Sequence, residues 1–203
     1  ISLGNIVGSC IANLLLILGI AAIIKPVKIN KCVMNEESII ILFAAIILLL
    51  FAAIGLLDEY HLIGGGLFLL FFIGALYAFI QCAKQRKKKI ESISLEKTRR
   101  NLLFIIFGIV GVILGAWLLI ESTISIATAL GIPSFFIALT VIAVGTSLPE
   151  LMVTITASRK NESDIMIGNI IGSNVFNIFL ILGLSALVIP LNAYAALDLM
   201  IIL

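Results

Sequence analysis

Charged side chains are scarce in this sequence. Asp, Glu, Lys and Arg together make up 12% of the 203 residues, His occurs once, and apolar residues make up 62%. A soluble domain carries roughly a quarter charged residues and about half apolar residues, so this chain has too little charge to cover a solvated surface. The composition excludes a soluble enzyme, a disordered tail and a nucleic-acid-binding protein. It predicts a protein that crosses a membrane several times.

Cysteine is also rare, with Cys10, Cys32 and Cys82 at unpaired spacings. Such spacing indicates neither a disulfide framework nor a zinc site. We therefore interpret the three residues as ordinary apolar or interfacial thiols.

Long apolar runs are abundant, and each is a candidate membrane helix. A spanning helix needs about 20 mostly apolar residues. The runs are continuous rather than alternating, so strands are not expected. Only Glu150 is charged inside the first six of the seven predicted segments. These segments are 1–24, 38–57, 62–83, 102–120, 135–157, 165–189 and the stub 194–203.

Basic residues are absent from every second loop. All 13 Lys and Arg residues lie in the loops 25–37, 84–101 and 158–164 or at their edges. Because positive charge marks the cytoplasmic side, these loops are expected there, and the alternation supports the segment count. The other loops carry acidic residues such as Asp58 and Glu121. The loop 84–101 also suits anionic lipid head groups, besides its ordinary role in setting topology.

An internal repeat relates the first and the sixth segments. Residues 1–26 and 165–190 align without a gap at an offset of 164, and 13 of 26 positions are identical. Shared Leu and Ile would mean little in apolar segments, but several Gly, Asn, Ser and Pro residues also match. Five segments separate one start from the other, so the two copies run in opposite directions. Inverted repeats are typical of secondary transporters, whose substrate site lies near the membrane midplane where the repeats meet.

Matching polar pairs lie near the middle of both copies. Ser9 and Asn13 are four residues apart, as are Ser173 and Asn177, so each pair shares a helix face. Interhelical hydrogen bonding alone is one interpretation of the Asn residues. Their symmetric placement favours a shared site. The Gly-x-x-x-Gly spacing beside each pair is interpreted as close helix packing.

The motif Gly145-Thr146-Ser147-Leu148-Pro149-Glu150 is the most informative stretch. Glu150 is about 6 Å from the middle of its segment at 1.5 Å per residue, and an acidic residue at that depth is costly and usually functional. Pro149 has no N–H and should kink the helix, leaving backbone oxygens unpaired. Thr146, Ser147 and Glu150 are expected on one face. A protonated Glu150 that only bonds a neighbouring helix is the structural alternative.

The predicted ligand set consists of hydroxyl, carbonyl and carboxylate oxygens. Oxygen ligands select hard cations such as Na⁺, Ca²⁺ or Mg²⁺ over zinc or copper. No Lys or Arg lies inside the predicted spans, so anionic substrates are disfavoured.

These motifs resemble the cation/calcium antiporter superfamily, and more narrowly a prokaryotic sodium/calcium exchanger. The resemblance rests on GTSLPE followed by GNIIGSNVFN, with the inverted copy GNIVGSCIAN elsewhere. It implies an all-α membrane fold of ten helices in two inverted halves, of which about six and a half are present here. Residues 1–83 would be part of the first half, 84–101 a basic linker and 102–203 a truncated second half.

The resemblance also implies a set of cation ligands. Glu150 would be a central carboxylate shared by Na⁺ and Ca²⁺, and the carbonyl of Ala143, freed by the helix break, would join it. The remaining implied site residues are Thr146, Ser147, Ser173, Asn177, Ser9 and Asn13. The carboxylate that pairs with Glu150 would lie upstream of Ile1, so we expect a chain that lacks both ends. Some relatives have Asp at the position of Asn177, which leaves proton coupling and stoichiometry open.

The sequence thus predicts an antiporter, and not an enzyme, that exchanges Ca²⁺ for Na⁺ by alternating access. No cofactor is expected beyond the transported ions. The partners are the two ions and the lipid bilayer, and the expected location is the cell membrane. A Ca²⁺/H⁺ exchanger, a K⁺-dependent cation exchanger and a non-transporting membrane subunit are the alternatives.

Overall fold

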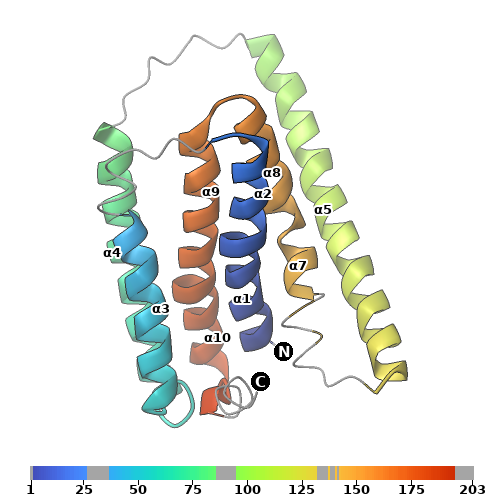
Figure 1. Ribbon diagram of the computed structural model, residues 1–203. Helices are drawn as coiled ribbons and strands as arrows, with labels where there is room; N and C mark the ends of the chain where they lie inside the picture. Colours follow the sequence, from blue (N-terminus) through green and yellow to red (C-terminus); the bar gives the residue numbers. More distant parts are fainter. Residues whose placement is uncertain are drawn as a thin grey trace.

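The computed structural model describes residues 2–26, 37–85, 95–131, 137, 140 and 142–194. All regular elements among these residues are helices, which pack side by side (Figure 1). In the described part of the chain, three helices are long and apolar enough to cross a membrane: Leu3–Ile24, His61–Lys84 and Ser163–Val188. The predicted all-α membrane fold is therefore confirmed. The loops 27–36 and 86–94, residues 132–136 and the stub beyond Tyr194 lie outside the described residues.

The first repeat helix is continuous but contains an irregular middle. It consists of α1 (Ser2–Ile11), a π-helical stretch η1 (Ala12–Ile17) and α2 (Leu18–Ile24). Both residues that flank η1 keep right-handed helical dihedrals. A π-helical turn widens the helix without ending it, and such turns are frequent at functional sites.

The second repeat helix has the same irregular middle. It consists of α9 (Ser163–Val175), the π-helical η4 (Phe176–Ile181) and α10 (Leu182–Val188). The first and last residues of η4 are those of η1 shifted by the repeat offset of 164. The last residue of α10, Val188, is likewise equivalent to the last residue of α2, Ile24. The two helices run antiparallel (Figure 1). The inverted repeat inferred from side chains thus extends to the irregularities of the backbone.

A helical hairpin packs beside the second repeat helix. It joins α3 (Ser38–Ala53) to α4 (His61–Gln85). The predicted segment 38–57 ends early, because Gly55 adopts a φ of +72° and the Leu56 N–H bonds the Phe51 carbonyl at 2.9 Å. This left-handed glycine cap stops α3 four residues before the predicted end.

The long helix α5 (Leu95–Ala129) corrects the prediction for 102–120. Residues 121–129 contain neither Gly nor Pro, so nothing in the sequence stops the helix at residue 120. It ends only at Gly131, which adopts a φ of +68°. Glu121 therefore lies within a helix rather than in the predicted loop.

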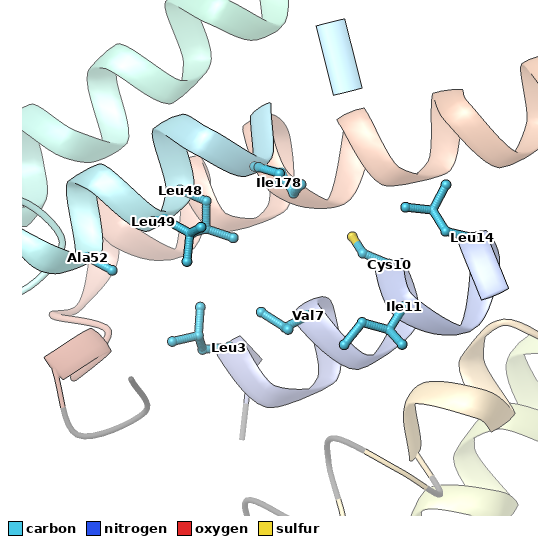
Figure 2. Close-up of a pocket in the computed structure, with 10 residues that line it drawn as sticks. Leu3, Val7, Cys10, Ile11, Leu14, Leu48, Leu49, Ala52 and Ile178 are labelled. Atoms are coloured by element: carbon cyan, nitrogen blue, oxygen red, sulfur yellow. The ribbon is translucent and has the colours of Figure 1, made fainter. Parts of the chain in front are cut away.

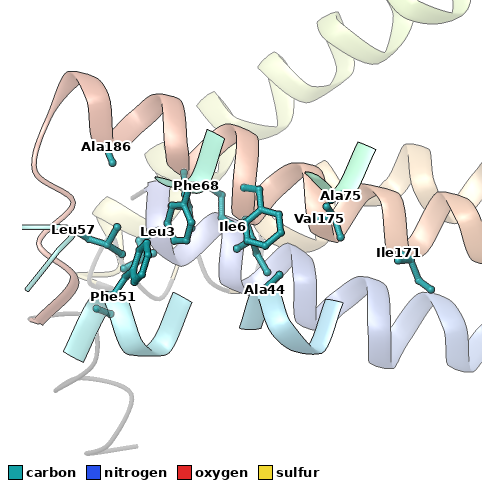
Figure 3. Close-up of a cluster of buried hydrophobic side chains, with 14 of the residues drawn as sticks. Leu3, Ile6, Ala44, Phe51, Leu57, Phe68, Ala75, Ile171, Val175 and Ala186 are labelled. Carbon is teal, nitrogen blue, oxygen red and sulfur yellow. The ribbon is translucent and has the colours of Figure 1, made fainter. Parts of the chain in front are cut away.

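Aromatic and small residues bind α3 and α4 to the second repeat helix. The rings of Phe51 and Phe68 stack with their centroids 5.1 Å apart within the buried cluster, near Leu3 and Leu57 (Figure 3). A Cβ atom on Gly65 would lie 2.7 Å from the carbonyl oxygen of Gly183, so the backbones of α4 and α10 touch where both residues lack side chains. This contact is closer than the one expected at Gly168 and Gly172, where a Cβ would meet no described atom within 4 Å.

The connection between α3 and α4 holds the end of the second repeat helix. The Asp58 carboxylate accepts hydrogen bonds from the backbone N–H groups of Ala193 and Tyr194 at 2.7 and 3.0 Å. Nδ1 of His61 lies 2.6 Å from the carbonyl oxygen of Ala186 and donates to it. Both side chains therefore fix the position of α10.

One cysteine prediction is wrong. Cys82 forms a disulfide, and its partner lies outside the described residues. The spacing of cysteines along a chain does not reveal a bond between distant positions, so this disulfide could not be predicted from spacing alone. Cys10 is free.

Candidate cation site

The candidate site is built around a break in the helix that carries the acidic motif. The predicted segment 135–157 is interrupted between α7 (Ala143–Thr146) and α8 (Leu148–Arg159). Ser147, between them, has φ −90° and ψ 0°. Pro149 occupies the first turn of α8 and has no N–H to donate to the Gly145 carbonyl one turn earlier. The kink expected from the proline is therefore present, two residues before it.

On one side of the break, Thr146 joins α7 to the first repeat helix. Its hydroxyl lies 3.1 Å from the Ala143 carbonyl, 3.3 Å from Oδ1 of Asn5 and 3.2 Å from the Ser9 hydroxyl. The Ser9 hydroxyl is also 3.4 Å from the Ala143 carbonyl. Four oxygens from two elements thus converge at this point.

On the other side, Glu150 faces the second repeat helix. The amide of Asn169 donates to the Glu150 carbonyl at 3.1 Å and to the Thr154 hydroxyl at 3.2 Å. Ser173 hydrogen-bonds the Glu150 carboxyl group and donates to the Asn169 carbonyl at 2.7 Å. Residues of α8 and α9 therefore fix the backbone around the carboxylate.

The two repeat helices meet through a buried amide pair. Nδ2 of Asn13 donates to Oδ1 of Asn174 at 2.9 Å, and the two residues are 1% and 0% exposed. The side chain of Asn177 hydrogen-bonds the thiol of Cys10 beside this pair. Asn13 is one helical turn from Ser9, and Asn174 directly follows Ser173.

Two buried oxygens of the site have no hydrogen-bond partner among the described residues. They are Oε2 of Glu150 and Oδ1 of Asn13. Buried polar atoms in proteins are almost always paired, and an unpaired carboxylate oxygen is especially costly. Each of these oxygens is a free acceptor of the kind that binds hard cations.

The structure brings the predicted residues together in pairs, with two corrections. Thr146 and Glu150 do not share one helix face, because the break at Ser147 directs Thr146 toward α1 and Glu150 toward α9. The Ala143 carbonyl is not freed, since it accepts the Ser147 N–H at 3.2 Å in addition to the two hydroxyl contacts. Ser147 is buried, and its carbonyl accepts the Leu151 N–H at 3.0 Å.

Four further residues, none of them predicted from the sequence, support the site: Asn5, Thr154, Asn169 and Asn174. Asn5 and Asn169 are matching positions of the repeat, so the repeat itself carried a signal for them. Asn174 is equivalent to Cys10 by the repeat offset, but the two residue types differ, so the identical positions of the repeat did not indicate it. Thr154 lies one helical turn after Glu150, a spacing that predicts a shared helix face but no role in the site.

An apolar cavity of about 250 Å³ lies on another side of α1. Figure 2 shows Leu48 and Leu49 of α3 opposite Leu3 and Val7 of α1, and Cys10 also lines the cavity. Because Cys10 contacts Asn174 as well, the cavity lies beside the crossing of the two repeat helices.

The chemistry of the site is that of oxygen ligands around one carboxylate. No group of three or more His, Cys, Asp or Glu residues that could hold a metal ion occurs in the described ranges. Hydroxyls, amide oxygens, carbonyls and Glu150 remain as donors. Oxygen donors of this kind suit hard cations.

Comparison with known proteins agrees with this chemistry. The sodium/calcium exchanger protein family matches residues 1–81 and 100–203. The sodium/calcium exchanger MaX1 of Methanosarcina acetivorans is 32% identical over 95% of this chain and 66% of its own length. An uncharacterized membrane protein of Methanocaldococcus jannaschii is 35% identical over 88% of this chain and 57% of its own length.

A solved structure is similar throughout the chain. The sodium–calcium exchanger NCX_Mj, soaked with Na⁺ and Sr²⁺, superposes with a TM-score of 0.69 at 35% identity. The match covers 98% of this chain and 65% of that one, so this chain spans about two thirds of the exchanger's length. On the repeat, the site and these matches, the chain belongs to the sodium/calcium exchanger protein family, a family of membrane transporters.

Proposed function

We propose that this chain carries the ion-binding region of a secondary active antiporter that exchanges Ca²⁺ for Na⁺. The observation that carries the proposal is the unpartnered, buried Oε2 of Glu150 beside a break in a membrane helix. A carboxylate in that position needs a cation or a proton. Family membership and the similarity to exchangers support Ca²⁺ and Na⁺ as the ions.

The proposed ligands contribute oxygens from both repeat helices and from the broken helix. Because Ca²⁺ and Na⁺ would compete for the same carboxylate, one ion must leave before the other binds, which enforces exchange. Rocking of the two helical halves around the site would then expose it to one side of the membrane at a time. The full proposed set is Glu150, Thr146, Ser147, Ala143, Ser173, Asn177, Ser9 and Asn13.

We further propose the arrangement in the membrane. The loops 25–37, 84–101 and 158–164 face the cytoplasm of a cell-membrane protein. Figure 1 supports this arrangement, since the C-terminal ends of α2 and α4 lie at the same end of the molecule as the turn between α8 and α9. Residues 1–83 would belong to the first inverted half, and residues 102–203 to the second.

The decisive experiment replaces Glu150 by Gln in the full-length protein, reconstituted into vesicles. Na⁺-driven Ca²⁺ uptake is expected to fall to background, because the neutral amide keeps the shape but removes the charge that attracts cations. The matched control is Glu59→Gln, which neutralises an exposed acid in the turn before α4 and should leave uptake unchanged. Wild-type uptake by Glu150→Gln would contradict the proposal.

The same vesicles separate the alternative functions. Ca²⁺ uptake driven by a pH gradient without Na⁺ would identify a Ca²⁺/H⁺ exchanger, and a requirement for K⁺ would identify a K⁺-dependent one. Absence of Ca²⁺ binding and of uptake in the wild type would favour a non-transporting subunit, in which the polar residues only hold helices together.

A further inference from the structure

The repeat offset makes Cys10 and Asn174 equivalent positions, and these two residues contact each other. The thiol of Cys10 lies 4.0 Å from the carbonyl oxygen of Asn174, and Nδ2 of Asn174 lies 3.5 Å from the carbonyl oxygen of Cys10. Each side chain therefore reaches the backbone of the other. Equivalent residues of an inverted repeat can touch reciprocally only where the approximate two-fold axis passes between them. The axis thus crosses the membrane region at this pair.

The two residues at the axis, Cys10 and Asn174, are of different types, and this difference determines how the Asn174 amide is oriented. A backbone carbonyl can only accept, so the Cys10 carbonyl requires the NH₂ group of Asn174 on its side. Oδ1 of Asn174 must then point toward Asn13, which in turn must present its own NH₂ group, at 2.9 Å. Oδ1 of Asn13 is consequently directed away from Asn174 and has no partner. One carbonyl thereby fixes the orientation of two buried amides.

The orientation matters because a rotated Asn13 would present the wrong atoms to a cation. An amide NH₂ group repels a cation, whereas the amide oxygen is a hard ligand. Asn13 is one helical turn from Ser9, whose hydroxyl joins the Thr146 cluster. Among the described residues, Asn174 is the hydrogen-bond partner of the Asn13 amide, while the Asn13 oxygen has none.

We infer that Asn174 is a positioning residue, which keeps the Asn13 carboxamide turned so that its oxygen faces the transported cation. This inference rests on the proposed function. Asn174 would touch no ion itself and would act only through Asn13. The second half has no equal arrangement, because Cys10 lacks an amide and binds Asn177 through its thiol.

The test measures equilibrium binding of radioactive Ca²⁺ to the purified full-length protein, together with the KM and maximal rate of Na⁺-driven uptake. Asn174→Leu fills a similar volume but offers no acceptor to Asn13, so the Ca²⁺ Kd and KM should rise about tenfold with little change in maximal rate. Asn174→Asp keeps an acceptor oxygen for Asn13 and should retain near-wild-type affinity. Asn101→Leu is the matched control, because it makes the same substitution at an exposed position of α5 and should leave the Ca²⁺ Kd and KM unchanged.

A double-mutant cycle distinguishes positioning from a general structural role. Asn13→Leu alone should weaken Ca²⁺ binding, and adding Asn174→Leu to it should cause no further loss, since the residue acts through Asn13. Additive losses, or wild-type affinity in Asn174→Leu, would overturn the inference. If Asn174→Leu does not fold, Asn174→Ser serves instead, because its shorter side chain cannot reach Asn13. A wild-type protein that binds no Ca²⁺ would contradict the proposed function and not the positioning role.

Discussion

The hydroxyl of Thr146 shows how much one small side chain does at this site. It is within hydrogen-bond distance of oxygens from Asn5 and Ser9 of α1 and from Ala143 of α7, so it joins two elements on one side of the helix break. Thr146 is predictable as a site residue from its place beside Pro149 and Glu150. Its partners in α1 are not, because a motif describes one helix and these contacts join two.

Replacement of Thr146 by Val tests this contact network. The isosteric change leaves partners of the hydroxyl without a hydrogen bond, so we expect a loss of about 1–3 kcal/mol in the free energy of unfolding. Thr146→Ser retains the hydroxyl and should lose much less. Thermal unfolding of both purified variants checks the difference, and equal melting temperatures for the two would show that the hydroxyl contributes nothing.

Asn174 marks the limit of residue-level prediction. The repeat indicated positions where both copies agree, and Asn174 is paired with Cys10, where they differ. The residue acquires its importance from a three-dimensional contact with Asn13 that no spacing along one helix encodes. Positions that break an internal symmetry can therefore be as informative as those that keep it.

At the scale of elements, the sequence located helices better than it located their ends. The three longest spans lie where apolar runs predicted them. The ends of α3 and α5 were wrong, because both depend on left-handed glycines, Gly55 and Gly131, and not on the hydrophobic pattern. The break at Ser147 was predicted from Pro149. Its effect was not predicted, because it directs Thr146 and Glu150 to different neighbouring helices, although both were expected on one helix face.

Pro149→Ala tests whether the break serves the site. An alanine supplies the N–H that Pro149 lacks, so the Gly145 carbonyl gains an intrahelical partner and the kink should relax. We expect a more stable helix but weaker Ca²⁺ binding, because Thr146 and Glu150 would rotate relative to one another. Ca²⁺ titration of the variant checks this expectation. Wild-type affinity together with a higher melting temperature would mean that the break is dispensable for binding.

At the scale of the whole molecule, the distribution of charge and the arrangement of helices agree. Lys84 and Arg159 lie in the last turns of α4 and α8, and Lys25 and Lys160 directly follow α2 and α8. These helix ends lie on one side of the molecule in Figure 1. Loop charge predicted this orientation because lipid excludes charged side chains whatever the details of packing. The packing itself depends on contacts such as Gly65 with Gly183, which loop charge does not reveal.

Side-specific labelling tests the orientation. In a full-length variant without native cysteines, Lys160→Cys should react with a membrane-impermeant maleimide only from the cytoplasmic side. Tyr60→Cys, which lies at the exposed start of α4, should react only from the opposite side. Labelling of both positions from one side would refute the predicted topology.

The matched π-helical stretches have a consequence for the history of the molecule. Three of the six side chains differ between Ala12–Ile17 and Phe176–Ile181, yet the backbone irregularity begins and ends at equivalent positions in both. Two independent insertions would have no reason to fall at the same place. The simplest origin is a single ancestral segment that already contained the widened turn before it was duplicated. The backbone shape of the turn has then been kept while half of its side chains have changed.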